Sequence, residues 1–224
     1  MQPIEKLIAG FQRFRSRHFV EAPVLYERLA QEGQSPKVMV IACCDSRVDP
    51  AIITDCDPGD LFVVRNVANL VPPCERDGSY HGTSAALEFA VTSLQVEHII
   101  VLGHGSCGGV RALLTGADQS QGESTFIANW MGIARQARDQ ALGDGQPLEN
   151  EQFVSAEQHV VRISLRNLMT FPFVSQRVQQ GRLHLHGWYF DLRGGQLLAC
   201  DPDSPRVTSL VEDDFPAVSE TSNS

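Results

Sequence analysis

Three short apolar runs constrain the fold of this chain more than any other feature. Residues 38–41 and 99–102 each run for four positions without a polar side chain, and residues 61–64 form a third such run between them. Runs of this length and composition are typical of strands buried on both faces of a parallel sheet. A segment of helical length, residues 82–95, separates the last two runs. The alternation predicts an α/β fold with a central, mostly parallel sheet flanked by helices.

Apolar residues at helical spacing mark the segment before this core. Over residues 2–31 they recur every three or four positions, and Pro23 is the expected break between two amphipathic helices. Such helices have an apolar face that they cannot bury on their own. We therefore expect an N-terminal helical arm that packs across a partner subunit.

The second half of the chain continues the pattern and ends in a hairpin. Helices are expected over residues 124–142 and 149–170, where apolar residues again follow the helical period. A strand-like segment from Arg182, a Gly-Gly turn and a return strand over residues 196–200 predict a C-terminal β-hairpin. The expected parts of the chain are the arm, one α/β domain and an acidic, loosely held tail: residues 1–33, 34–201 and 202–224.

Composition limits the classes of function. The chain has 224 residues, 42% hydrophobic and 20% charged, which is typical of a domain with one buried core. Its formal net charge of -9 argues against nucleic acid as a partner, because a phosphate backbone binds basic surfaces. No apolar run approaches the roughly 20 residues of a membrane span. With six cysteines and no secretory signal, we expect a cytoplasmic protein with reduced thiols.

Cysteine and histidine residues follow two of the predicted strands. Cys43 comes after the first run, and His104 and Cys107 come after the run at residues 99–102. Because the carboxyl ends of parallel strands meet at one edge of a sheet, we expect these three side chains to lie together. Two thiolates and an imidazole favour a tetrahedral zinc ion, and the lack of a fourth Cys or His at ligand spacing indicates an open, catalytic position.

The motifs around these residues resemble those of the β-class carbonic anhydrases, most closely the plant-type branch. The similar segments, over residues 34–110, are QSPKVMVIACCDSRV, FVVRNVAN, GTSAALEFAV and GHGSCGGV. The resemblance implies that Cys43, His104 and Cys107 hold one Zn²⁺ per chain. It implies an enzyme for the reversible hydration of CO₂ to bicarbonate and a proton, in which zinc-bound hydroxide attacks CO₂. It also implies a homodimer or a dimer-based higher oligomer.

Asp45 and Arg47 follow the first cysteine in a CxDSR motif. Asp45 can bind the zinc as a fourth ligand, or it can accept a hydrogen bond from the attacking hydroxide, and these roles exclude each other. A bidentate pair with Arg47 would hold the carboxylate off the metal. The resemblance implies that both arrangements occur in the family, and members that close often have a tryptophan where this chain has Val40. We therefore expect the open form, with Asp45 and Arg47 as the catalytic pair.

The resemblance also assigns a substrate pocket. It implies that Gln34, Phe62, Phe89 and Gly108 bind substrate. An amide donor beside apolar walls suits CO₂, a small nonpolar molecule whose product is an anion. Phe89 stands where the plant-type branch has a tyrosine, so the phenolic hydroxyl is absent, and we expect only a modest effect on rate.

Three other functions fit parts of the pattern. A zinc-dependent COS or CS₂ hydrolase would use the same ligands with different pocket access. A noncatalytic zinc or bicarbonate-binding module would have a site permanently closed by Asp45. Thiol catalysis by Cys107 with His104 would leave Cys43, Asp45 and Arg47 without roles.

Two further groups of reactive residues are expected to have structural roles. Cys44 neighbours a ligand but is expected to point to the other side of the backbone as a buried, small hydrophobe. His184 and His186 alternate on a predicted strand and therefore share one face. A solvated or interface face is expected there, because the sequence places no carboxylate or thiol nearby.

Overall fold

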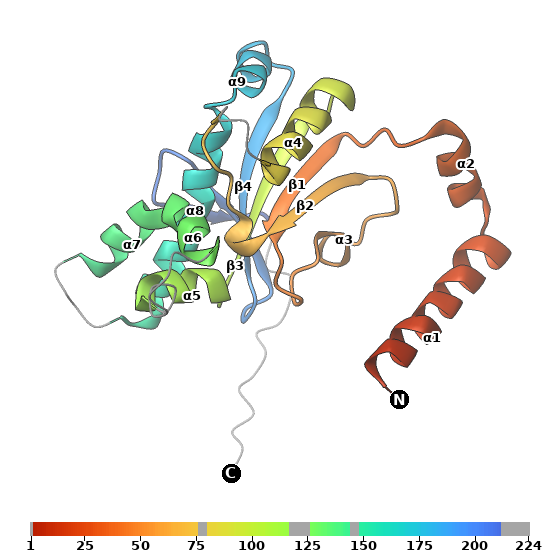
Figure 1. Cartoon of the computed structure of the whole chain (residues 1–224), viewed down its shortest axis with the longest axis horizontal. Helices are drawn as coiled ribbons and strands as arrows, with labels where there is room; N and C mark the ends of the chain where they lie inside the picture. Colours follow the sequence, from red (N-terminus) through yellow and green to blue (C-terminus); the bar gives the residue numbers. More distant parts are fainter. Residues whose placement is uncertain (1, 76–79, 117–125, 144–147, 212–224) are drawn as a thin grey trace.

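A six-stranded sheet forms the centre of the structure, a computed structural model that describes residues 2–75, 80–116, 126–143 and 148–211. The strand order is β2-β1-β3-β4-β5-β6 (Figure 1). The first four strands in this order pair in parallel, and β5 and β6 add antiparallel pairs at one edge. The predicted fold, a mostly parallel sheet with helices and a C-terminal hairpin, is confirmed. The strands are β1 (Val38–Cys43), β2 (Leu61–Asn66), β3 (His98–His104), β4 (His184–Asp191), β5 (Gln196–Cys200) and β6 (Val207–Ser209).

Helices surround this sheet and form the amino-terminal arm. Among the described residues, none of them is both long and apolar enough to cross a bilayer. The α-helices are α1 (Pro3–Arg15), α2 (Val24–Glu32), α3 (Pro50–Ile53), α4 (Gly82–Glu88), α5 (Gly108–Thr115), α6 (Phe126–Met131), α7 (Arg135–Leu142), α8 (Asn150–Leu168) and α9 (Pro172–Gln179). The short π and 3-10 segments are η1 (Ser16–Glu21), η2 (Val67–Asn69), η3 (Phe89–Ser93) and η4 (Gly132–Ala134).

The apolar runs form strands because both faces of the sheet are covered. Successive side chains of a strand point to opposite faces. Met39 and Ile41 of β1 therefore join one buried cluster together with residues of α8, and Val40 and Ala42 join a second cluster on the other face. A strand in this position has no exposed face for polar residues, which explains the unbroken apolar run.

Helix α8 packs directly on the strands through the predicted stripe. Val161, Leu165 and Leu168 are all buried in the main cluster. Two glycines of the sheet permit this approach, since a Cβ atom at Gly103 would lie 2.5 Å from Val161 Cγ2, and one at Gly187 would lie 2.7 Å from Leu165 Cδ1. These distances are too short for a real Cβ, so a larger residue at either position would push the helix away from the sheet.

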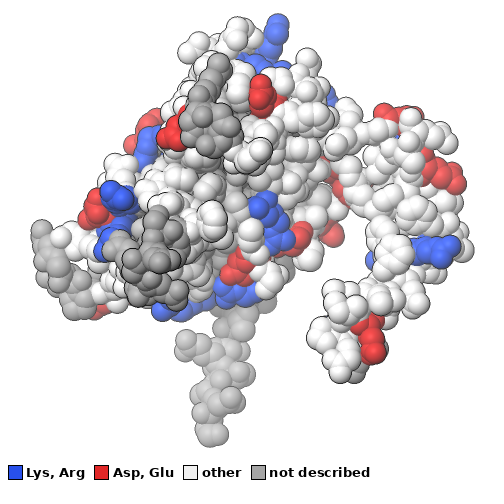
Figure 2. Space-filling view, viewed as in Figure 1, with Lys and Arg blue, Asp and Glu red and all other residues white. Residues whose placement is uncertain are grey.

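The predicted N-terminal helices are present as α1 and α2, and they extend away from the sheet (Figure 1). Neither helix has a buried residue. Ile4, Leu7, Ile8 and Phe11 recur at helical spacing in α1, and each is at least 55% exposed. In the same view, Figure 2 shows acidic and basic side chains interspersed over the domain and the arm. Among the described residues, the apolar face of α1 therefore has no cover.

The structure refines three predicted boundaries. The helix expected over residues 124–142 is divided, because a 3-10 turn at η4 separates α6 from α7. The helix expected over residues 82–95 begins as α4 and continues as the π-helical turn η3. Strand β6 was not predicted: it lies within the expected tail and pairs with β5, so the sheet continues past residue 201. The rest of that tail, residues 212–224, lies outside the described residues.

Candidate metal centre

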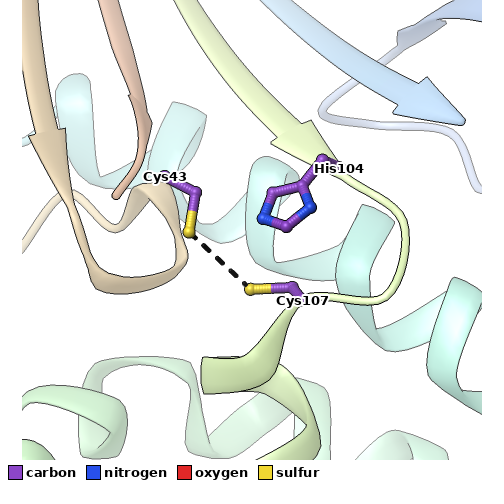
Figure 3. A group of neighbouring side chains, drawn as sticks. All are labelled: Cys43, His104 and Cys107. Atoms are coloured by element: carbon purple, nitrogen blue, oxygen red, sulfur yellow. Dashed lines mark hydrogen bonds between the residues drawn. The ribbon is translucent and has the colours of Figure 1, made fainter. Parts of the chain in front are cut away.

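Cys43, His104 and Cys107 meet at the carboxyl edge of the sheet (Figure 3). Cys43 ends β1, His104 ends β3, and Cys107 is the N-terminal cap of α5. One potential ligand atom of each lies within 4.8 Å of the others, and the two sulfur atoms are 4.0 Å apart. All three residues are buried, with at most 4% of their surface exposed. The structure therefore brings together the three residues that the sequence predicted as ligands.

This donor set fits a zinc ion. His104 Nδ1 lies 2.9 Å from the carbonyl oxygen of Gly105, whereas His104 Nε2 is buried and has no hydrogen-bond partner. Because a carbonyl can only accept, Nδ1 donates the proton and Nε2 presents its lone pair toward the sulfur atoms. Tetrahedral zinc with Zn–S bonds of about 2.3 Å separates two thiolates by about 3.8 Å. The sulfur atoms of Cys43 and Cys107 are already close to that separation.

The thiols of Cys43 and Cys107 affect each other's ionisation through their contact. The hydrogen bond with Cys107 lowers the pKa of Cys43 to about 4. The same contact raises the pKa of Cys107, so the pair shares one proton in the chain without metal. A cation that displaces this proton is bound by two thiolates, which are the form in which cysteine coordinates zinc.

Asp45 and Arg47 form a two-pronged ion pair beside the ligands. Arg47 donates from Nε to Asp45 Oδ1 over 2.9 Å and from Nη2 to Oδ2 over 2.7 Å. The same Nη2 donates to the carbonyl of Ser106 over 3.1 Å, so Arg47 joins the loop after β1 to the loop after β3. Hydrogen bonding from Arg47 is the main reason that the pKa of Asp45 is lowered. The Asp45 carboxylate is outside the group of three ligand atoms.

Arg65, at the end of β2, holds the turn that carries Cys43. It donates to the carbonyl oxygens of Cys43 and Asp45 and to the carboxylate of Asp49, over 2.9, 2.6 and 2.8 Å. Asp49 in turn caps α3 by accepting from the backbone N–H of Ala51. The role of Arg65 was not predicted from the sequence. Its position at a strand end beside the CxDSR motif was the available signal.

Glu157 supports the second ligand loop and was also missed. It lies on α8, is only 4% exposed, and accepts a hydrogen bond from the backbone N–H of Cys107. Burial is the main cause of its raised pKa. The sequence offered one signal, a carboxylate within an apolar helical stripe, but no means to find its partner.

The turn after β2 packs tightly against the start of α5. A Cβ atom at Gly109 would lie 2.7 Å from Val67 Cγ1 and 3.3 Å from the Cβ of Ala68. Ala68 is fully buried and has a left-handed backbone (φ 62°), as does Ser106 (φ 59°) between the two ligands. Non-glycine residues adopt this conformation only where the surroundings enforce it. The ligand loops are therefore held by packing as well as by hydrogen bonds.

The four predicted pocket residues fall into two groups. Gly108 directly follows Cys107 at the start of α5, beside the metal ligands. Phe62 pairs with Met39 in the register of β1 and β2. Met39 lies four residues before Cys43 in β1, which is about 13 Å along the strand. The ring of Phe89 lies 6.0 Å from that of Phe62, and Gln34 is exposed just before β1. Within one chain, this group is at the opposite end of the strands from the ligands.

Comparison with known proteins shows the family of the chain that carries this cysteine and histidine site. A family model described as carbonic anhydrase matches residues 38–197. The chain is 38% identical over 197 residues to beta carbonic anhydrase 3 of Arabidopsis thaliana, which covers 87% of this chain and 76% of that protein. The chain belongs to the β-carbonic anhydrases. It is also 36% identical to a carbonic anhydrase of Synechocystis sp., over 88% of this chain and 71% of the relative.

Solved carbonic anhydrase structures share this fold over nearly the whole chain. The structure of the β-carbonic anhydrase CcaA has 32% identity and a TM-score of 0.84, covering 94% of this chain and 93% of that one. The β-carbonic anhydrase CafA of Aspergillus fumigatus has 30% identity and a TM-score of 0.78, with coverage of 91% and 93%. This carbonic anhydrase therefore catalyses the reversible hydration of CO₂ to bicarbonate, with zinc held by Cys43, His104 and Cys107.

One prediction beside the metal centre is wrong. Cys44 was expected to be buried, but it is exposed. The reason is that β1 ends at Cys43, so the alternation of a strand no longer directs the next side chain into the core. The backbone N–H of Cys44 instead donates to the carbonyl of Asn66.

Proposed function

We propose that Asp45 and Arg47 are the catalytic pair of CO₂ hydration and that the enzyme works in the open form. The observation that carries this proposal is the two-pronged contact between the two side chains, at 2.9 and 2.7 Å. Both oxygens of the carboxylate accept from Arg47, which also donates to the carbonyl of Ser106. A carboxylate fixed at two points cannot turn toward the metal ligands without breaking charged hydrogen bonds.

The pair has a defined part in the chemistry. When bound, zinc would supply a Lewis acid that lowers the pKa of a water molecule, so that the water gives up a proton and becomes a nucleophile toward CO₂. Asp45, kept ionised by Arg47, accepts a hydrogen bond from the attacking solvent molecule and directs its lone pair at the carbon of CO₂. Arg47 is a positioning residue, because it acts by fixing the direction of the carboxylate.

The test is stopped-flow CO₂ hydration on protein of known zinc content. We expect Asp45→Asn to lose about 10²-fold in kcat, the usual range for a group that acts on a transferring proton, and Arg47→Ala to lose activity as well, both at unchanged zinc content. Asp139→Asn, which removes an exposed carboxylate from α7, is the matched control. Wild-type rates in either pair variant would refute the proposal.

We also propose that the enzyme is a dimer, or an assembly of dimers, in which each metal centre is completed by Gln34, Phe62 and Phe89 of a second copy. In one chain Phe62 lies about 13 Å from Cys43 along the strands, too far to touch a CO₂ molecule beside it, and Phe89 packs with Phe62. Phe89 is 47% exposed although it is aromatic. A second copy that covers this end of the sheet would bury Phe89 and bring an apolar wall to the substrate.

The arm supplies the expected contact between the two copies. Its apolar face, which includes Leu7 and Phe11, is at least 55% exposed in the isolated chain, and exposed apolar surface of this kind marks an interaction site. A Sordaria macrospora relative with 27% identity and a TM-score of 0.73, covering 92% of this chain and 96% of that one, is described as tetrameric. Sedimentation velocity tests the assembly. We expect Phe11→Asp to shift the enzyme toward monomers, whereas Lys6→Asp, on another side of α1, leaves the assembly intact.

We further propose that the enzyme works in a reducing compartment such as the cytoplasm. All six cysteines are free, and two of them must stay reduced to bind zinc. Fractionation of the source cells with an antibody to the chain tests this.

A further inference from the structure

Three histidines meet on one face of the sheet, at the end away from the metal centre. His98 begins β3, and His184 begins β4 directly beside it in the parallel register. His186 follows two residues later on β4, so its side chain points to the same face. A solvated or interface face was predicted at His184 and His186 from the sequence. The sequence offered no means to place His98 next to them.

The contacts among these rings are close. His98 Nδ1 lies 3.1 Å from His186 Nε2. The ring centroids of His98 and His184 are 5.3 Å apart and stacked, and those of His98 and His186 are 5.2 Å apart. The strands hold all three backbones, so the arrangement does not depend on a loop. Rigid elements of this kind suit a ligand site, because little ordering remains to be done when an ion binds.

We propose that His98 and His186, joined by His184, form a second metal site for a late first-row divalent ion such as Zn²⁺ or Ni²⁺. A metal bound to two imidazoles at about 2.0–2.1 Å separates their nitrogens by about 2.9–3.4 Å for angles from square to tetrahedral. The 3.1 Å between Nδ1 of His98 and Nε2 of His186 falls within this range. Imidazole ligands suit Zn²⁺ and Ni²⁺ better than hard ions such as Mg²⁺ or Ca²⁺.

Metal binding requires one proton to move within the pair formed by His98 and His186. In the metal-free pair, one of the two facing nitrogens carries a proton and donates a hydrogen bond to the other. Metal binding needs both lone pairs, so the donor ring moves its proton to its other nitrogen and stays neutral. Burial, followed by the charges of His98 and His184, lowers the pKa of His186, which keeps this ring neutral and ready to coordinate near neutral pH.

His184 supplies the third nitrogen. It is exposed, whereas His98 and His186 are half-buried. Its ring stacks on His98 in the metal-free chain. Among the described residues, only Cys43, His104 and Cys107 already hold three ligand atoms within 4.8 Å of one another, so the His184 ring must turn about its side-chain bonds to reach the ion. A pair of fixed ligands with one adjustable ligand leaves further positions for water, as expected for an accessory site rather than a buried structural one.

The charged residues beside the histidines include one carboxylate and three basic side chains. A hollow of about 570 Å³ borders His98 and His184, and its charged lining residues are Lys37, Glu97, Arg177 and Arg182. Lys37 pairs with Glu97 at 2.7 Å. Arg177 donates to the backbone carbonyls of Val91, Val96 and Arg182, so its guanidinium is held by the backbone. The positive charge of Arg177 and Arg182 still opposes a cation, which predicts a site weaker than the thiolate centre.

Titration of the full-length enzyme, already loaded with one zinc per chain, tests the proposal. Isothermal titration calorimetry with Ni²⁺ and with Zn²⁺ should reveal one further ion per chain. His98→Gln and His186→Gln should each weaken this binding by about tenfold or more, as ligand or supporting-residue losses do, and His184→Gln should weaken it less. His18→Gln, in the arm, should leave it unchanged.

NMR of the imidazole rings distinguishes the loss of a metal ligand from the loss of the fold. In ¹⁵N-detected imidazole spectra of the wild-type enzyme, Zn²⁺ should shift the resonances of His98 and His186. Each variant should retain its first zinc and its circular dichroism spectrum. The proposal is overturned if the loaded enzyme takes up no further ion, or if the His98 and His186 variants bind it as tightly as the wild type. Neither outcome bears on CO₂ hydration, since the readout is a second ion.

Discussion

The backbone N–H of Cys107 donates a 2.9 Å hydrogen bond to Oε1 of Glu157, a residue on a different element fifty positions later. The other carboxylate oxygen, Oε2, accepts from the hydroxyl of Tyr189 over 2.8 Å. Tyr189 and Glu157 are both nearly fully buried. A zinc ligand is thus tied through its backbone to α8 and, through Tyr189, to β4.

Replacing Glu157 should loosen the metal centre. In Glu157→Ala, the N–H of Cys107 has no protein partner, so the loop that carries this ligand is no longer fixed. We expect zinc affinity to fall by about 10–100-fold, as it does when groups that orient metal ligands are removed. Chelator competition measures this, with Gln158→Ala as the neighbouring control. Unchanged affinity in Glu157→Ala would mean that packing alone positions Cys107.

Replacing Tyr189 should affect stability more than zinc. Tyr189→Phe keeps the ring and removes one hydrogen bond, which leaves a buried carboxylate oxygen unsatisfied. We expect the free energy of unfolding to fall by about 1–3 kcal/mol, with a smaller loss of zinc affinity than in Glu157→Ala. Urea denaturation at matched zinc content gives the first quantity. A Tyr189→Phe enzyme as stable as the wild type would argue against a strong Tyr189 to Glu157 bond.

The lowered pKa of Asp45 predicts how stability changes with pH. A carboxyl whose pKa is lower in the folded state adds stability above its unfolded pKa, about 3.9, and this contribution is lost as the pH falls through the folded value. Asp45→Asn removes the contribution. The wild type should therefore be more stable than Asp45→Asn at pH 7, and the difference should shrink below about pH 4. Urea unfolding at several pH values checks this, and a constant difference would contradict it.

Phe89 lacks the hydroxyl of the tyrosine found in the plant-type branch, and this difference should have little effect on kcat. Phe89 keeps the apolar ring of the plant-type tyrosine and packs 6.0 Å from Phe62. We expect Phe89→Tyr to change kcat by less than about threefold, well below the effect of a general acid or base. Stopped-flow CO₂ hydration decides this. A large gain in turnover would show that the hydroxyl takes part in a rate-limiting step.

The sequence was most informative where periodicity and strand ends determine position. The runs at residues 38–41 and 99–102 became β1 and β3, and the parallel register then brought Cys43 and His104 together. This follows from geometry, because parallel strands end at a common edge. Arg47 lies so close to Asp45 in the chain that their pairing needed no tertiary information.

Relationships that depend on packing could not be predicted from one sequence. Glu157 reaches Cys107 only because α8 lies against the sheet, and His98 reaches His186 only because β3 and β4 are neighbours. Strand β6 is three residues long, too short for a periodic signal. Phe62 and Cys43 likewise lie at opposite ends of the strands because of the register of β1 and β2, and the spacing of the motifs along the sequence does not reveal that register.

The most direct test of this account is the coordination of the metal itself. X-ray absorption at the zinc edge, on freshly purified enzyme of measured metal content, should show one tightly bound zinc per chain with two sulfur ligands and at least one imidazole nitrogen. Cys107→Ser should remove one sulfur and most of the CO₂ hydration activity, since this ligand lies 4.0 Å from Cys43 in the shared site. An active enzyme without zinc, or zinc without sulfur ligands, would contradict the assignment.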